Sequence, residues 1–243
     1  MSIPLPELSP RLKLLYSKIP ENQPFYDMCC DHGYIALHAF QNLNIPKTFA
    51  IDIVPNIIKR IRIKLPQYFT NIPENTERNV STWSVKQNQK ELLGFSDGAE
   101  KLTNVQGTLM IAGVGTHTLL KIFQVHKENP SVNRWILSTH TDNLKLRQAL
   151  KKSHWKLVQE DLVHEKHYRE ILVLERIGVE IDPIWNGLNL SQEESLIYLK
   201  HLKKETDFIQ NKGAKVEGLL QQLKAKIKRC ESSEMSVLPL TNI

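Results

Sequence analysis

Short apolar segments alternate with amphipathic segments through the first 178 residues of the chain. Residues 25–29, 48–53 and 108–112 are apolar runs of strand length. Between the first two runs, residues 34–42 place apolar side chains at helical spacing, which predicts an amphipathic helix. Strands that alternate with helices form a mostly parallel sheet covered on both faces, so an α/β fold is predicted.

The remaining segments extend this alternation as far as residue 175. Ser9 is a favourable N-cap and Pro10 suits a first turn, which predicts a helix from residue 10 to about residue 18. Further helices are expected at 55–68, 119–127 and 142–153, and further strands ending near 95 and at 135–139, 156–163 and 169–175. Residues 71–90 are polar and show no clear pattern. Because the last two strands are separated only by residues 164–168, they are predicted to form an antiparallel hairpin that ends the sheet.

The C-terminal part follows a different pattern. Residues 178–189 contain the turn formers Asp182-Pro183 and Asn186-Gly187 and are predicted to be a linker. Beyond the linker, one set of positions repeats every seven residues: Leu202, Ile209, Val216, Leu223 and Cys230. A glycine after Asn211 is a natural helix end, which predicts two helices folded back as a coiled-coil hairpin. The alternative is one continuous helix that dimerises with a second chain. The expected domains are residues 1–178 and 179–243.

Composition narrows the class of protein. The chain has 243 residues, of which 41% are hydrophobic and 24% charged, as in globular proteins with a sizeable core. Without a long apolar run or a signal-like start, we expect a cytoplasmic protein with no membrane segment. The three cysteines lack the spacing of zinc ligands, and His164 and His167 have no evident third ligand. Reduced thiols and no metal are therefore expected.

The basic residues are unevenly distributed. Residues 1–178 carry 23 Lys or Arg against 17 Asp or Glu, whereas residues 179–243 carry 9 of each. Clusters such as residues 59–64 (KRIRIK) and Lys151-Lys152 can meet phosphates of a nucleic acid. The alternative, which we favour for any single cluster, is a solvated helix face.

A tight acidic turn follows the first predicted strand. It comprises residues 27–34 (DMCCDHGY), and Asp52 lies at the end of the next strand. In a parallel sheet such a turn approaches a nucleotide-type cofactor, and an acid about 20 residues after the glycine binds ribose hydroxyls. The turn is not GxGxxG, because Cys29 and Asp31 stand where dinucleotide binders prefer glycine. A cofactor without phosphates is expected, and S-adenosylmethionine meets this description.

The acids at the strand ends are the main candidates for cofactor binding. Asp27 either orders the turn at the methionine end of the cofactor or bonds its own backbone in an Asx turn. Asp52 either binds both ribose hydroxyls or caps the helix that begins near Pro55. Asp31 and His32 flank the expected methyl-transfer path and are the candidate catalytic residues, although His32 is also explained by hydrogen bonds to backbone carbonyls. The vicinal cysteines are expected to be packing residues. The full candidate cofactor site is Asp27, Cys29, Asp31, Gly33, Tyr34, Asp52, Ile53, Asp97, Gly98, Ala112 and Gly113.

Several stretches together resemble the bacterial tRNA adenine-22 N1-methyltransferase family. They are residues 8–12 (LSPRL), 19–20 (IP), 27–34, 111–115 (IAGVG) and the end strands around Glu170-Ile171. The resemblance implies a class I S-adenosylmethionine-dependent domain with a Rossmann-like sheet whose last strand is antiparallel, and a C-terminal helical coiled coil. It also implies activity on N1 of an adenine in tRNA. Asp97 would be the acid that contacts the cofactor's adenine, with a turn residue as the alternative.

The chain departs from the family pattern at three places. Cys29 replaces a glycine, Gly115-Thr116 replaces Gly-Gly, and residues 137–140 (LSTH) replace Leu-Gln-Pro-Asn. The last change lies where related enzymes contact the target adenine. Three hypotheses follow: a tRNA adenine N1-methyltransferase, a methyltransferase of the same fold with another base or a small molecule as substrate, and a non-catalytic protein that binds the cofactor and acts through its coiled coil. Under the first, tRNA is the partner and a monomer is expected.

Overall fold

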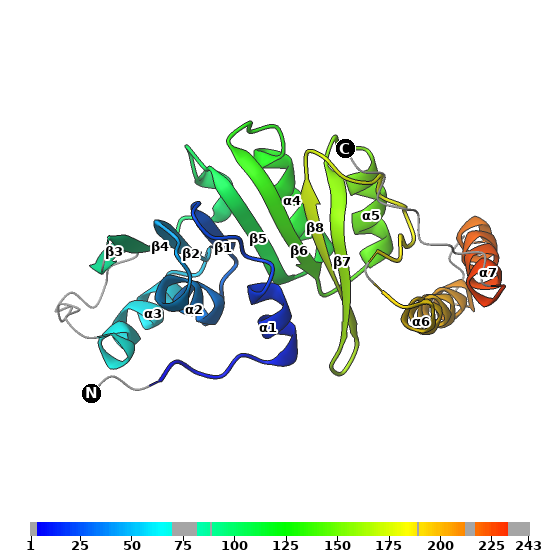
Figure 1. The fold of residues 1–243 in the computed structure, drawn as a ribbon, viewed down its shortest axis with the longest axis horizontal. Coiled ribbons are helices and arrows are strands. Elements are labelled where there is room, and N and C mark those ends of the chain that lie inside the picture. Colours follow the sequence, from blue (N-terminus) through cyan, green and yellow to red (C-terminus); the bar gives the residue numbers. More distant parts are fainter. Residues whose placement is uncertain (1–3, 70–81, 88, 189, 212–216, 233–243) are drawn as a thin grey trace.

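The computed structural model describes residues 4–69, 82–87, 89–188, 190–211 and 217–232 (Figure 1). Within these residues, eight strands form one sheet in the order β3-β4-β2-β1-β5-β6-β8-β7. The strands are β1 (Phe25–Met28), β2 (Lys47–Ile51), β3 (Thr82–Gln87), β4 (Lys90–Phe95), β5 (Gly107–Val114), β6 (Val132–Thr139), β7 (Lys156–His164) and β8 (Tyr168–Glu175). The helices are α1 (Pro10–Tyr16), α2 (Tyr34–Asn42), α3 (Pro55–Tyr68), the 3-10 turn η1 (Ala99–Lys101), α4 (Thr116–His126), α5 (Asn143–Lys151), α6 (Gln192–Asn211) and α7 (Glu217–Glu231).

The centre of the sheet is parallel and both edges are antiparallel. Strand β1 pairs in parallel with β2 and β5, and the parallel arrangement continues through β4 and β6. The expected hairpin of β7 and β8 is present, with β8 antiparallel to β6. The sequence did not reveal the second antiparallel pair, β3 with β4. Strand β3 is an edge strand in which only Trp83 and Val85 are buried, so its apolar pattern is too short to stand out.

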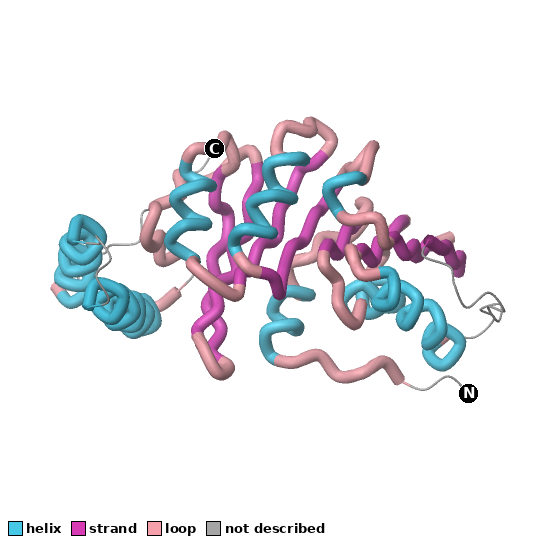
Figure 2. Tube along the Cα trace, turned by 180° about the vertical axis from the view of Figure 1, so that it is seen from behind, coloured by secondary structure: helices cyan, strands magenta, loops and turns pink. Residues whose placement is uncertain are grey.

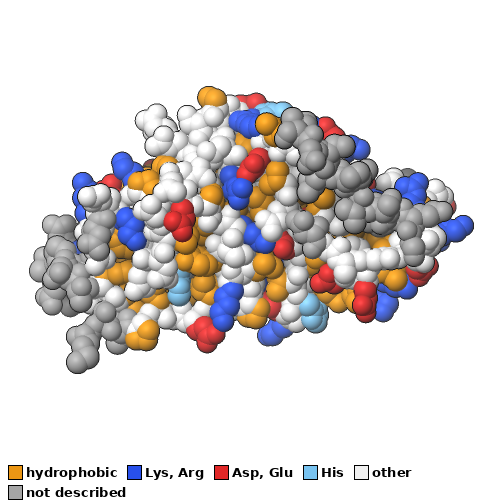
Figure 3. Space-filling view, in the orientation of Figure 1, with side chains coloured by type: hydrophobic (Ala, Val, Ile, Leu, Met, Phe, Trp, Pro, Cys, Tyr) orange, Lys and Arg blue, Asp and Glu red, His pale blue; other side chains and the backbone are white. Residues whose placement is uncertain are grey.

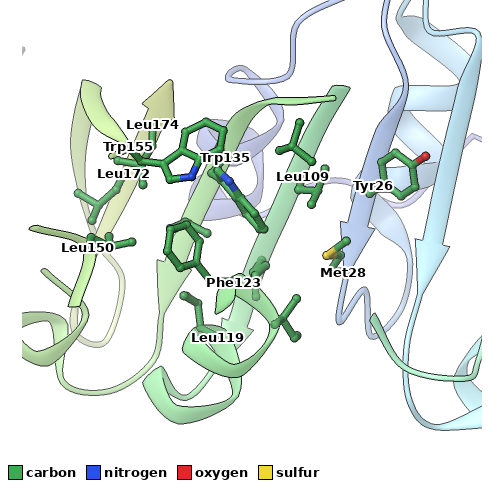
Figure 4. Packing of buried hydrophobic residues seen from close by; sticks show 14 of the residues in the cluster. Tyr26, Met28, Leu109, Leu119, Phe123, Trp135, Leu150, Trp155, Leu172 and Leu174 are labelled. Carbon is green, nitrogen blue, oxygen red and sulfur yellow. The ribbon is translucent and has the colours of Figure 1, made fainter. Parts of the chain in front are cut away.

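Alternating side chains divide the core into two layers. Phe25, Met110, Ile136 and Ile171 pack against α1 and α2, whereas their chain neighbours face α4 and α5 on the other side of the sheet. Figures 1 and 2 show these helices on opposite faces. In the α4 and α5 layer, Trp135 contacts both Phe123 and Trp155 edge to face (Figure 4). Helices cover both faces of the sheet, which confirms the predicted α/β class. The carboxyl ends of the strands remain available for a binding site.

The C-terminal helices α6 and α7 lie side by side beyond α5 and β7, as Figures 1 and 2 show. Leu202, Leu223 and Cys230 of the heptad set are buried, together with Leu199 and Leu220. They share a core with Trp185 and Tyr198. Two helices are therefore present in place of one continuous rod, while the domain boundary after residue 178 and the oligomeric state remain predictions. The segment expected to contain the turn, residues 212–216, lies outside the described residues.

A buried charge network joins α6 to the sheet. Arg147 of α5 is fully buried and forms ion pairs with Glu160 of β7 and Glu170 of β8. The hydroxyl of Tyr198, in α6, donates a hydrogen bond to Glu170 and accepts one of 3.1 Å from the side chain of Asn143. Because a buried charge must be paired, this network fixes where α6 sits on the sheet.

Candidate functional site

A small cavity of about 150 Å³ opens at the carboxyl ends of β1 and β5. Seven residues of the predicted site line it: Asp27, Cys29, Asp31, His32, Tyr34, Ala112 and Gly113. Five further lining residues were not among the predicted site residues: Arg11, Leu12, Cys30, Ile35 and His140. The structure therefore brings together residues from α1, the β1–α2 turn, the end of β5 and the end of β6.

The β1–α2 turn owes its shape to an unusual run of backbone angles. Cys29, Asp31 and Gly33 have φ values of 66°, 48° and 69°, in the left-handed region. A side chain at Gly33 would bring its Cβ within 2.6 Å of Ile61 Cδ1, so the turn needs glycine there. The amide of Gly33 donates to the Cys30 carbonyl at 2.8 Å, and the amide of Cys30 donates to Ile51 at 2.9 Å. The turn is thus held against β2.

Asp52 links the ends of β1 and β2. It is 8% exposed; Oδ2 accepts a hydrogen bond of 3.2 Å from the Asp31 amide, and Oδ1 accepts one of 3.0 Å from the Val54 amide. The N-cap residue of α3 is Val54, so the capping alternative for Asp52 does not hold. Each carboxylate oxygen retains a lone pair for a further donor, such as a ribose hydroxyl.

Asp27 is a buried acid in an unfavourable electrostatic environment. Burial raises the pKa of its carboxyl to about 7, and the negative charge of Asp52 adds to the rise. A hydrogen bond from the Ala36 backbone opposes the rise. At neutral pH the group is therefore divided between its charged and neutral forms, and a cation bound beside it would favour the charged form.

The other predicted cofactor residues lie beside the cavity but do not line it. Ile53 follows β2 and is 69% exposed, while Gly98 follows β4. A Cβ on Gly98 would lie 3.8 Å from Ile53 Cδ1, so the exposed side chain of Ile53 lies against the buried Gly98. Asp97 is exposed and pairs with Lys101 at 2.7 Å. These residues extend the site along the ends of β2 and β4.

The two adjacent cysteines are protonated packing residues. Burial raises the pKa of the Cys29 thiol to about 12, and Asp52, Asp27 and Glu100 contribute to the rise. Burial likewise raises the pKa of the Cys30 thiol, which belongs to the core shared by α2 and α3. Since the thiolate is the reactive form, neither cysteine is suited to act as a nucleophile.

A second, much larger groove of about 1080 Å³ lies between the β7–β8 hairpin, the start of α5 and α6. Its lining includes the aromatic residues Tyr168 and Tyr198 and the cations Lys145, Arg169 and Lys204. His140 lines both the groove and the small cavity. Burial lowers the pKa of His140, as do the positive charges of Arg11 and Arg169, so its imidazole is neutral at pH 7. The groove and the small cavity therefore meet at His140, whose side chain is uncharged at pH 7.

The elements around the small cavity lie in a region that matches a known protein family. A family model described as a methyltransferase domain matches residues 8–172. The chain belongs to the methyltransferase-domain family. Its match begins before α1 and ends in β8, so it includes every element that lines the small cavity.

Individual relatives share the fold over most of the chain. A Mycoplasma pneumoniae protein named "Putative tRNA methyltransferase" is 24% identical over 202 residues, which cover 81% of this chain and 82% of the relative. The structure of M. capricolum TrmK with S-adenosylhomocysteine has a TM-score of 0.65 at 14% identity and covers 93% of this chain and 97% of its own. The B. subtilis m1A22 tRNA methyltransferase TrmK has a TM-score of 0.62 at 19% identity and covers 93% and 98%. Because the sequence identities are low, these two structures show a shared fold and nothing further. The shared fold covers 93% of this chain in both.

The residues of the methyltransferase domain fit one end of S-adenosylmethionine in the cavity. Asp27 and Asp31 suit its cationic groups, and Asp52 lies one strand away with lone pairs for hydroxyls. The cavity is smaller than the roughly 300–1,000 Å³ typical of ligand pockets, so the nucleoside would lie outside it, beside the exposed side chain of Ile53. Within the described residues, no group of three or more His, Cys, Asp or Glu is placed to hold a metal ion. No helix in this part of the chain is long and apolar enough to cross a membrane.

Proposed function

We propose that this methyltransferase domain transfers the methyl group of S-adenosylmethionine to N1 of an adenine in tRNA. The observation that carries the proposal is that two spaces meet at His140: a small cavity with acidic residues at the cofactor turn, and a wide groove whose lining includes aromatic and basic residues beside Asp142 and Glu205. Aromatic and basic linings suit bases and phosphates. The named activities of the M. pneumoniae and B. subtilis relatives support this substrate class.

Methyl transfer mainly requires that adenine N1, the methyl group and the sulfur atom be aligned. The sulfonium cofactor supplies an activated methyl group, and adenine N1 already carries a lone pair. Asp31 and His32 have exposed side chains on the cavity lining, His32 Nε2 lying 3.7 Å from Asp31 Oδ2. In this proposal Asp31 stabilises the positive charge that the adenine gains, and His32, whose ring stacks on Tyr34, orients the base.

The RNA must present an unstacked adenine to this cavity. Bases in loops of folded RNA are unstacked, whereas bases in a helix must be flipped out. The groove between the β7–β8 hairpin and α6 is wide enough for flanking nucleotides, so the C-terminal helices would take part in holding tRNA. A tRNA substrate also agrees with the expected cytoplasmic location.

The test is methyl transfer to unmodified tRNA, read by mass spectrometry of the nucleosides. Wild-type protein should produce 1-methyladenosine, and Asp31→Ala should lower the transfer rate while leaving tRNA affinity nearly unchanged. A different methylated nucleoside would favour the second hypothesis, a methyltransferase of the same fold that acts on another substrate. The departure of residues 137–140 from the family pattern is the reason to consider it. Absence of any methylated nucleoside with normal cofactor binding would favour the non-catalytic hypothesis.

A further inference from the structure

Arg169 lies where the large groove meets the small cavity. It belongs to the first turn of residues in β8 and lines the groove, and its Nη1 donates to the carbonyl of His140 at 3.3 Å. His140 lines both spaces. A Cβ on Gly113 would lie 3.9 Å from His140 Nε2, so the ring of His140 lies beside the end of β5. Arg169 is therefore bonded to the residue at which the two spaces join.

The alternation of side chains along β8 places Arg169 on the face that carries α1. Ile171 packs against α1 on this face, whereas Glu170 joins the buried charge network on the other face. Arg11 of α1 lies within electrostatic reach. Burial lowers the pKa of Arg11, and the positive charge of Arg169 adds to the decrease, although Glu165 opposes it. Two positive charges thus act on one another at this edge of the sheet.

No carboxylate of the described residues forms an ion pair with Arg169. Its hydrogen bonds run from Nη1 to two backbone carbonyls, those of His140 and Tyr168. Glu165 pairs with the other arginine, its Oε2 lying 4.0 Å from Arg11 Nε. The two carbonyls hold the guanidinium in place, and the donors on its Nε–Nη2 edge remain available.

The available edge of this guanidinium is suited to a phosphate. A planar guanidinium binds phosphate through two parallel hydrogen bonds, and an anion would relieve the repulsion between Arg169 and Arg11. Arg169 lines the groove but not the small cavity, so the position favours an anion of the RNA over one of the cofactor.

We propose that Arg169 binds a backbone phosphate of the RNA that flanks the adenine to be methylated. The inference rests on the proposed function and adds to it a phosphate site on β8. A nucleotide carries its phosphates one sugar away from its base, so a base that passes His140 toward the cavity leaves its phosphates at the end of the groove, beside Arg169. Binding there holds the nucleotide in its flipped position.

The experiment removes the charge from each partner in turn. In tRNA assembled from synthetic segments, the phosphate on either side of the methylated adenosine is replaced by a neutral methylphosphonate, and the reference tRNA keeps the ordinary phosphate. With the wild-type chain, one of these two replacements should weaken binding about 10-fold, as expected for a hydrogen bond to a charged group.

The effect should depend on the arginine. Arg169→Ala should bind the reference tRNA about 10-fold more weakly, and in this variant the same methylphosphonate should cost less than about 2-fold, because its partner is already absent. Arg169→Lys should restore part of both effects, since it returns the charge without the paired geometry. A purely structural role for Arg169 would not make the loss specific to one phosphate.

Lys204 provides the matched control. It lines the same groove from α6 and is likewise absent from the lining of the small cavity. Lys204→Gln should weaken tRNA binding yet keep the full cost of the methylphosphonate, because it contacts a different phosphate. Both variants should bind S-adenosylhomocysteine within about 2-fold of wild type. Circular dichroism of each variant verifies that the fold is intact.

Three results would overturn the inference. They are a full methylphosphonate effect in Arg169→Ala, no effect of either flanking methylphosphonate on the wild-type chain, and a loss of S-adenosylhomocysteine affinity in Arg169→Ala, which would assign the arginine to the cofactor. If the wild-type protein methylates no adenosine in tRNA, the proposed function fails and the inference fails with it. Methylation of tRNA without the coupling removes the inference alone.

Discussion

At the scale of single residues, the state of Asp27 depends on what occupies the cavity. Its pKa is about 7 in the ligand-free protein because burial and Asp52 both disfavour the carboxylate. The ammonium group of S-adenosylmethionine, if bound beside it under the proposed function, would lower that pKa. Cofactor binding and loss of a proton would then be coupled.

This coupling predicts a pH-dependent affinity for S-adenosylhomocysteine. Above about pH 8 Asp27 is already charged and the affinity should be flat. Below pH 7 binding must first expel a proton, so the affinity should fall by up to about tenfold per pH unit. Calorimetry between pH 6 and 8 measures it. Asp27→Asn should bind weakly and without this dependence. Methylthioadenosine, which has the same nucleoside without the ammonium and carboxylate groups, should show a flat profile; parallel profiles for the two ligands would contradict the prediction.

A second prediction concerns the glycine of the turn. Gly33→Ala should destabilise the protein by about 2–3 kcal/mol, because alanine disfavours a positive φ and its Cβ would meet Ile61 Cδ1. Ile61→Val removes that atom and alone should cost about 0.5–1.5 kcal/mol. In urea unfolding, the double variant should lose less than the sum of the two. Strict additivity would show that the clash does not matter.

The sequence reveals some of these residues and conceals others for physical reasons. Asp27, Gly33 and Asp52 stand at the strand ends and turn where local geometry constrains residue type, so their positions can be inferred. Arg11 gives no such signal, because its place in the cavity depends on α1 packing across the sheet and on Glu165, 154 residues away. His140 was noticed only as a departure from a family pattern.

At the scale of elements, the network of Arg147, Glu160, Glu170 and Tyr198 determines how α6 meets the sheet. The network also reaches the large groove, since Tyr198 lines that space. The sequence predicted the hairpin through its heptads but not this attachment, because no local pattern indicates that Arg147 and Tyr198 meet. A one-residue change in α6 register would break the hydrogen bond from Tyr198 to Glu170.

Tyr198→Phe tests that attachment. Loss of the hydroxyl leaves the buried Glu170 with one donor fewer, which should cost about 1–3 kcal/mol of unfolding free energy. Cleavage of the C-terminal helices by a protease should accelerate, because local opening becomes easier. The control is Tyr168→Phe, whose hydroxyl makes no hydrogen bond with the described residues; it should change stability by less than about 0.5 kcal/mol. Equal effects of the two variants would remove Tyr198 from the attachment.

At the scale of the whole molecule, the net charge of +6 does not form a single basic patch on the face that Figure 3 displays. Figure 3 shows Lys and Arg interspersed with Asp and Glu over the face that it displays. The basic cluster predicted at residues 59–64 does not lie wholly on the exposed face of α3, because Arg60 is exposed whereas Arg62 is buried. Sequence counts of charge could not show this, because burial depends on which helix face meets the core. The groove near α6 is thus the better candidate for phosphates.

This difference gives a prediction about tRNA affinity and salt. Affinity should fall steeply as salt rises, and Lys204→Gln should reduce the slope of the log–log plot by about 1, the loss of one phosphate contact. Arg60→Gln on α3, which lies at the opposite end of the sheet from α6 in Figure 1, should leave the slope unchanged. Filter binding across a salt series measures both. The reverse outcome would place the RNA over α3.

The contact between α1 and the β7–β8 hairpin also has a consequence for synthesis on the ribosome. Arg11 is among the first residues to emerge and Glu165 follows 154 positions later, and the nearby Lys18 forms an ion pair of 2.8 Å with Asp161 of the same hairpin. The N-terminal segment therefore gains these two contacts only after most of the domain has been translated. A nascent chain fastens its N-terminal helix to the hairpin only when the last strand pair has formed, so these contacts mark completion of the domain.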